Sequence, residues 1–250
     1  SNSYNVAIGS SAGAAVTTGI QNTIIGGLAG DALTTGLNNT VLGYGALSTE
    51  DTGSRAIAIG YKALLTQNYD GSSYNVAIGY EAGTNISTGI KNTITGGLAG
   101  DAITDGTENT VYGYSAFSAE DSGASNTAIG AQALGTQDGG SNNTALGRQA
   151  GLNVSDGSNN TILGANAGDD VTSGSNNTLI GQGAGNVLTT GSNNVVIGRD
   201  TDLAANSNTS SIIIGEGLTG LGSSTTLIGS TATTKAHVHG LVKPTNATTA

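Results

Sequence analysis

Cysteine, methionine and tryptophan are absent from this 250-residue sequence, and proline occurs once, at Pro244. Without cysteine there is no disulfide framework and no thiol chemistry. Seven basic residues are scattered among seventeen acidic ones, whereas a protein that binds duplex nucleic acid clusters Lys and Arg against the phosphates. We therefore expect no nucleic-acid partner.

Long apolar runs are also missing. No stretch approaches the ~18 residues that a membrane-spanning helix needs, so we expect no insertion into a membrane. The sequence has neither a signal-peptide pattern nor an initiating methionine, which indicates a fragment or a processed chain. The scarcity of proline suits a chain whose backbone N–H groups serve hydrogen-bond ladders, and the 42 glycines suit its many turns.

A short apolar segment that ends in glycine returns through the chain, and its clearest copy is Asn160–Gly164. The interval is 17 residues, except 19 between Gly60 and Gly79 and 14 between Gly215 and Gly229. Such regularity is typical of a solenoid, in which each coil buries its face against its neighbours. We predict an all-β fold, a parallel β-solenoid (β-roll) of about 14 coils, each built as strand, turn, short strand and turn. The closing glycines are Gly9, Gly26, Gly43, Gly60, Gly79, Gly96, Gly113, Gly130, Gly147, Gly164, Gly181, Gly198, Gly215 and Gly229.

The coils fall into blocks. Tyr4–Gly9 returns as Tyr74–Gly79, which indicates a duplication of four coils, and we place the two extra residues of the long coil in a corner loop within Gln67–Ser73. We predict a β-roll domain over 1–230, divided into the duplicated blocks 1–70 and 71–140, uniform coils over 141–198 and degenerate terminal coils over 199–230, followed by an extended C-terminal tail over 231–250.

Four residues before the closing glycine, eleven of the fourteen coils carry asparagine, and Ala56, Ser211 and Thr225 are the exceptions. A corner asparagine tolerates left-handed backbone angles, and copies stacked at ~4.8 Å per coil can form an amide ladder. We interpret the column as a structural ladder rather than as a row that binds glycans. Its members are Asn5, Asn22, Asn39, Asn75, Asn92, Asn109, Asn126, Asn143, Asn160, Asn177 and Asn194.

Two further positions indicate how the interior is filled. Coils with glycine four residues after the closing glycine, such as Gly83, carry a large apolar residue three positions later, here Ile86. Other coils reverse the order, as in Leu64 followed by Gln67. Because voids and overpacking each cost about 1–3 kcal/mol, we expect one large apolar side chain per coil to occupy a shared space.

The strand segments are apolar on both faces. The residue two before each closing glycine is always aliphatic, and its neighbour one before the glycine, which points the other way, is aliphatic in twelve of fourteen coils. A strip of that kind ~65 Å long is not stable against water on a lone chain, so we expect further copies of the chain to cover it. The predicted interface residues are Ile8, Ile25, Leu42, Ile59, Ile78, Tyr112, Ile129, Leu146, Leu163, Ile180, Ile197, Ile214 and Ile228.

The repeats Asn5–Gly9, Asn75–Gly79 and Asn126–Gly130 resemble those of trimeric autotransporter adhesin heads, and Gly157–Gly164 with the Ala-Gly that follows is similar to repeats of bacteriophage tail fibres. The resemblance covers about residues 1–230 and implies a left-handed parallel β-roll, with three rolls side by side. It also implies a rigid stalk or receptor-binding head at a cell surface or virion tail, outside the cell, with a glycan or protein receptor as partner. The 17-residue coil departs from the adhesin coil of about 14 residues, which only the last coil matches.

The two histidines of the chain, His237 and His239, are two residues apart, so an extended segment would place both rings on the same face. In a trimer, three such pairs would offer six imidazoles to an octahedral transition metal such as Fe²⁺. The segment resembles His-x-His metal sites of trimeric phage fibres. The ion would clamp the chains, and no cofactor is otherwise required; an exposed pair in a mobile tail is the alternative, and the sequence leaves both open.

Catalytic constellations are weak. The adjacent acids Glu50–Asp51 and Glu120–Asp121 could serve glycoside hydrolysis, but they lie in turns and we interpret them as solvated charges. Calcium at Asp31, Asp101 or Asp169–Asp170 would lack the spacing of calcium-binding rolls. No serine has a histidine placed for a triad, and no phosphate loop occurs. We predict that the protein is not an enzyme.

The leading functional hypothesis is therefore a structural and adhesive fibre segment that forms or presents a receptor-binding surface. The principal alternative is a self-assembling extracellular filament subunit. Two further classes carry less weight. A column of threonines such as Thr23 and Thr161 would suit an ice-binding solenoid, and a carboxylate pair facing a groove would suit a polysaccharide depolymerase.

Overall fold

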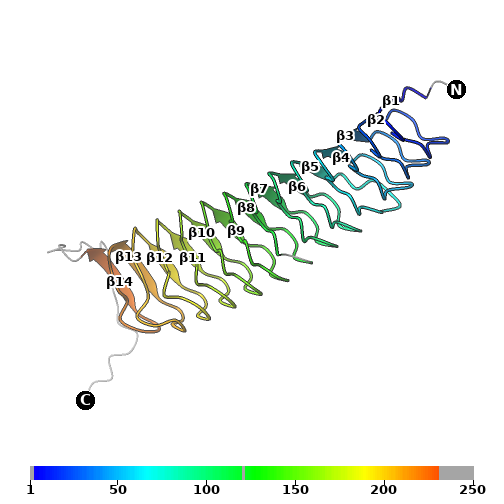
Figure 1. Cartoon of the computed structure of the whole chain (residues 1–250). Coiled ribbons are helices and arrows are strands. Elements are labelled where there is room, and N and C mark those ends of the chain that lie inside the picture. The colour runs from blue at the N-terminus through cyan, green and yellow to red at the C-terminus, as the bar shows by residue number, and fades with distance from the viewer. Residues whose placement is uncertain (1–2, 120–121, 231–250) are drawn as a thin grey trace, which may run out of the picture.

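The computed structural model of the protein describes residues 3–119 and 122–230. Fourteen parallel strands form a single sheet in which their spatial order follows the chain. They stack along one edge of an elongated body, with β1 and β14 at its opposite ends (Figure 1). The prediction of a parallel β-solenoid is confirmed. The strands are β1 (Val6–Ile8), β2 (Thr23–Ile25), β3 (Thr40–Leu42), β4 (Ile57–Ile59), β5 (Val76–Ile78), β6 (Thr93–Thr95), β7 (Thr110–Tyr112), β8 (Thr127–Ile129), β9 (Thr144–Leu146), β10 (Thr161–Leu163), β11 (Thr178–Ile180), β12 (Val195–Ile197), β13 (Ile212–Glu216) and β14 (Thr226–Ser230).

Each strand pairs in register with the strand one coil further on, so that Ile24 faces Val41 and Ile162 faces Leu179. The second residue of each strand points inward and is buried from β2 to β13, beginning with Ile24 at 1 % exposure. These inward side chains join the larger apolar side chains of the turns in one continuous core. Such a core is assembled coil by coil, because no coil can bury its own face alone.

The predicted second strand in each coil is wrong for the described residues. In its place, isolated hydrogen bonds join neighbouring coils, such as Gly13 N–H to the Ala29 carbonyl at 2.9 Å and Thr17 N–H to the Thr34 carbonyl at 2.9 Å. The reason lies in the backbone: left-handed residues recur along these sides, among them Leu47 with φ of 50°, and they interrupt any extended run.

The shared interior space is confirmed. A methyl group on Gly83 would come within 3.0 Å of Ile86 Cδ1, whereas Leu64 in the preceding coil fills that region itself and is fully buried. The closing glycines are required for a different reason, the close approach of neighbouring coils. Gly26 has a φ of +137°, and a Cβ there would lie 2.4 Å from the carbonyl oxygen of Gly43, so any side chain would separate the coils.

The long coil returns to register before β5, where Ile57 pairs with Val76. Its extra residues form a corner loop in which Asn68 and Asp70 are exposed. Ser72 pairs with Ser54 through an isolated parallel β-bridge. Among the described residues no helix is long and apolar enough to cross a membrane.

Candidate functional site

The asparagine column is an inward hydrogen-bond ladder. Asn160 shows the pattern: its Oδ1 accepts from the backbone N–H of Asn177 at 3.0 Å, and its Nδ2 donates to the carbonyl of Gly174 at 2.8 Å. From Asn22 onward the ladder side chains are at most 1 % exposed, so they cannot contact an external ligand. The left-handed residue is not the ladder asparagine but the one before it, such as Asn159 with φ of 61°.

The ladder breaks at Ala56, and a buried polar cluster lies beside the break. Glu50 accepts from the N–H of Gly53 at 2.7 Å and from Gln67 Nε2 at 3.1 Å, and Gln67 Oε1 accepts from Asn75 Nδ2 at 2.8 Å. Gln67 also donates to Ser73 Oγ at 3.2 Å. Glu50, Gln67, Ser73 and Asn75 are all fully buried. These hydrogen bonds continue the buried polar column through the coil in which Ala56 replaces asparagine.

Glu50 is therefore not a solvated turn charge, and that part of the sequence interpretation is wrong. Burial raises the pKa of the Glu50 carboxyl, while hydrogen bonds from Gln67, Gly53 and Tyr69 oppose the rise. Its carboxylate faces the interior and makes structural bonds, which leaves it no access to a substrate. Two anomalies, Ala56 in the asparagine column and the 19-residue coil, lie side by side in the sequence and could have indicated this compensation.

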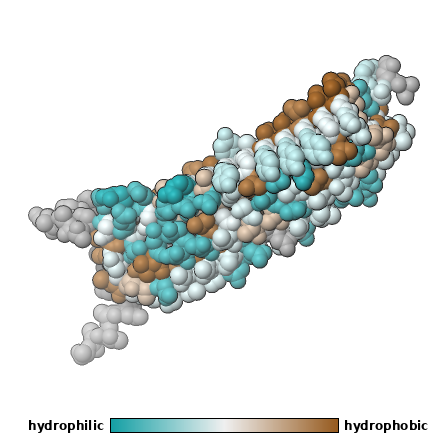
Figure 2. Space-filling view, viewed as in Figure 1, coloured by the Kyte–Doolittle hydropathy of each residue, from teal (hydrophilic) through white to brown (hydrophobic). Residues whose placement is uncertain are grey.

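The outward face of the sheet carries two parallel columns. The outer column, defined as the residues one before each closing glycine, includes Ile8 at 59 %, Leu42 at 45 % and Leu146 at 48 % exposure, and its other aliphatic members are exposed or half-buried. The position three before each closing glycine, which is threonine in nine of the fourteen coils, shares this face. Figure 2 shows the apolar row in brown along the upper edge of the N-terminal half, beside a row of paler side chains. The predicted interface residues thus lie on one exposed surface.

A third column, the corner column, consists of the residues that follow each closing glycine. Three of its members are stacked tyrosines: Tyr44 and Tyr61 have ring centroids 5.8 Å apart, and Tyr61 and Tyr80 have centroids 5.2 Å apart, with nearly parallel planes. Lys62 lies over the Tyr61 ring at 5.2 Å. The corner column was not predicted, because the periodic pattern of the strands does not include the residues that follow each closing glycine.

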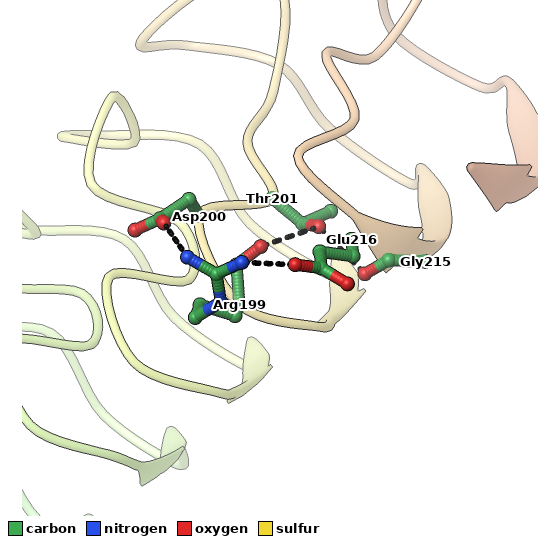
Figure 3. A network of polar contacts seen from close by, with 5 residues as sticks. All are labelled: Arg199, Asp200, Thr201, Gly215 and Glu216. Atoms are coloured by element: carbon green, nitrogen blue, oxygen red, sulfur yellow. Dashed lines mark hydrogen bonds and ion pairs between the residues drawn. The ribbon is translucent and has the colours of Figure 1, made fainter. Parts of the chain in front are cut away.

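Near β13 the corner column becomes ionic. Arg199 pairs with Asp200 at 3.0 Å and with Glu216 in the next coil, and Thr201 Oγ1 donates to the carbonyl of Gly215 at 2.7 Å (Figure 3). The negative charge of Glu216, through its hydrogen bond, raises the pKa of Arg199. All three charged side chains are more than half exposed, so each pair contributes little to stability. The network joins two coils and offers no reactive geometry.

Some of the remaining predicted site residues fall outside the described residues, and the others do not come together in a site. His237, His239, Glu120 and Asp121 fall outside the described residues. Within residues 3–119 and 122–230, no three His, Cys, Asp or Glu side chains come together in a group that could hold a metal ion. Asp101 has one buried carboxylate oxygen with no hydrogen-bond partner, and burial raises its pKa.

Comparison with protein-family models and with curated proteins finds no match to this chain.

Proposed function

We propose that the protein is a structural and adhesive fibre segment in which three copies lie side by side and cover one another's outer columns. The observation that carries the proposal is the outward face of the sheet, where large aliphatic side chains of β1–β5 and β8–β14 are exposed or half-buried, Ile8 and Ile228 among them. A soluble protein rarely leaves apolar strips of this length in water.

The energetics favour association. Burying a large aliphatic side chain fully is worth about 1.5–3 kcal/mol, so covering the exposed part of one outer-column residue gains at most about 1 kcal/mol. Summed over the column this reaches at most on the order of 10 kcal/mol per chain, which is comparable to the estimated 4–15 kcal/mol cost of association. In-register strands favour an equally regular partner, and a second copy of the same chain supplies one.

The fibre role follows from shape and composition. The body is an unbranched stack of coils whose interior is packed with apolar side chains and a buried amide ladder, which makes it stiff along its length (Figure 1). Together with the resemblance of its repeats to adhesin heads and phage fibres, this favours a stalk or head that carries a receptor-binding surface at a cell surface or virion tail. A structural iron at His237 and His239 would belong to the same assembly.

Site-directed cross-linking tests the proposal, because the chain has no native cysteine. Leu163→Cys places one thiol in the outer column, and the matched control Asn159→Cys places one on an exposed corner of the same coil. With a short bismaleimide at dilute protein concentration, we expect covalent dimers from Leu163→Cys and none from Asn159→Cys. Equal cross-linking of both variants, or of neither, would contradict a specific interface at the outer column. Open-ended polymers cross-linked through other positions would support the filament alternative.

A further inference from the structure

The stack of tyrosines in the corner column has a gap. Tyr44, Tyr61 and Tyr80 occupy consecutive coils, the next coil carries Gly97, and the coil after that carries Tyr114 at 62 % exposure. The Tyr61 ring stacks against one face of the Tyr80 ring, so that face is already covered. The opposite face of Tyr80 looks across Gly97 toward Tyr114, and no aromatic side chain stands between them in the column.

The outer column changes in the same coil. The aliphatic row continues to Ile78, whose partner in β6 is Thr95, and Thr95 in turn pairs with Tyr112 in β7. One coil thus presents small side chains, Thr95 and Gly97, in both columns at once, and the next coil presents two exposed tyrosines. We call the corner-column part of this arrangement the tyrosine gap: a floor of Gly97 between Tyr80 on one side and Tyr114 on the other, because the proposed association covers Thr95 and Tyr112 in the outer column.

The floor of the gap is open. A Cβ built on Gly97 would meet a single atom within 4 Å among the described residues, Tyr114 Cδ2 at 3.9 Å. Gly97 does not have the left-handed φ of the closing glycines, so the backbone does not require glycine at this position. The equivalent position holds tyrosine in the coils of Tyr44, Tyr61 and Tyr80. The fold therefore does not require the absence of a side chain at Gly97, and this absence is a property of the surface.

The width of the gap selects its occupant. Ring centroids in the stack are spaced by 5.2–5.8 Å per coil, so two such steps would place the rings of Tyr80 and Tyr114 about 10–12 Å apart. A flat aromatic ligand in van der Waals contact with both rings needs only ~7–8 Å and would leave a void of about 3 Å. A saturated six-membered ring is thicker, because it is puckered and carries substituents above and below its mean plane.

The charge around the gap excludes anions. Glu81 lies close enough to raise the pKa of the Tyr80 hydroxyl, chiefly through its charge and against the opposing charge of Lys62, and its charge also raises the pKa of Asp101. The chain as a whole carries a formal charge of −10. A phosphate, a sulfated sugar or a nucleic acid would be repelled. The Glu81 carboxylate and the hydroxyls of Tyr80 and Tyr114 supply acceptors and donors suited to a ligand with several hydroxyl groups.

We propose that the tyrosine gap binds one neutral pyranose ring of a glycan, with its C–H faces stacked between Tyr80 and Tyr114. The apolar faces of a pyranose suit the negative faces of aromatic rings, and its hydroxyls reach the polar groups at the rim. The biological source of the glycan rests on the proposed adhesive function, but the binding itself does not. Because loss of one tyrosine removes one of the two stacking faces, it should weaken binding about tenfold.

The duplicated block supplies an internal control. The coil that corresponds to Thr95 and Gly97 carries Ile25 and Gly27, and the position equivalent to Tyr80 is Ser10. That coil also has glycine at the corner but no pair of facing aromatic rings, and a Cβ on Gly27 would lie 3.3 Å from Tyr44 Cδ2, closer than the contact at Gly97. Gly97→Tyr should complete the stack and fill the gap while leaving Tyr80 and Tyr114 in place. Gly27→Tyr makes the same substitution where no gap exists.

The test is saturation-transfer NMR with the methyl glycosides of glucose, galactose, mannose and N-acetylglucosamine, with choline as a non-sugar probe. We expect at least one glycoside to bind the wild-type protein and the Gly27→Tyr variant, and its affinity to fall at least tenfold in Gly97→Tyr and Tyr114→Ala. Absence of binding by all four glycosides, equal binding by Gly97→Tyr, or binding by choline alone would overturn the proposal. Light scattering on each variant separates the two proposals, because a change in chain association alters the native mass and a filled gap does not.

Discussion

Replacing Asn160 by alanine should remove more stability than its small size suggests. The side chain accepts from Asn177 N–H at 3.0 Å and donates to the Gly174 carbonyl at 2.8 Å, and both partners are buried. Without Asn160 these two groups lose their partners in the interior, and each unsatisfied group costs about 1–3 kcal/mol. We therefore expect a loss of about 2–6 kcal/mol in the free energy of unfolding.

The assay is urea unfolding combined with amide hydrogen exchange, because a solenoid can unfold region by region and a single midpoint averages over coils. The exchange of the Asn177 amide should accelerate in Asn160→Ala, since that amide loses its acceptor. The control is Asn159→Gly in the same coil, where the side chain is exposed and the φ of 61° suits glycine, so its effect should stay within about 0.5 kcal/mol. A loss below about 0.5 kcal/mol, or an Asn177 amide that stays protected, would refute the stabilising role of the ladder.

Three further predictions follow from single positions. The pKa of Glu50 is raised from 4.5 in the folded state, so its contribution to stability is present below pH 4.5 and is lost as the pH rises through the folded pKa. The unfolding free energy of Glu50→Gln relative to wild type should therefore rise over that window, and a difference that does not vary with pH would contradict the burial of Glu50. Ser125 has a φ of 58°, and Ser125→Asn should stabilise the protein by about 0.5 kcal/mol in thermal unfolding, whereas a loss would argue against left-handed strain there. Leu163→Glu should reduce the native mass measured by light scattering, whereas Asn159→Glu should not, and an unchanged mass in Leu163→Glu would count against the outer column as an interface.

The strand positions could be predicted from the sequence because two signals coincide there. The 17-residue interval fixes which residues stack, and the two-residue alternation fixes which of them point inward, so that Ile162 faces the core and Leu163 faces outward. The asparagine ladder was predictable for the same reason: a polar residue repeated in register must meet its own copies.

The turns could not be predicted in the same way. A second, short strand was expected in each coil, but left-handed residues such as Leu47 interrupt that side, and most residue types give no sequence signal for this conformation. Burial of Glu50 depends on the loss of one asparagine and on the inserted loop together, a combination that no single column displays. The tyrosine gap could not be predicted from the strand pattern, because Tyr80, Gly97 and Tyr114 lie beyond the ends of their strands, and the exceptions at Thr95 and Tyr112 mark only the neighbouring column.

The most direct test of the proposed side-by-side fibre is its native mass in solution, measured by light scattering on a size-exclusion column with and without a strong chelator. The proposal predicts a mass near three times 24.3 kDa, or 72.9 kDa. A lower mass with chelator would support a structural metal at His237 and His239. A mass of 24.3 kDa at native concentration would contradict the central claim, because the outer columns would then be stable in water on a single chain.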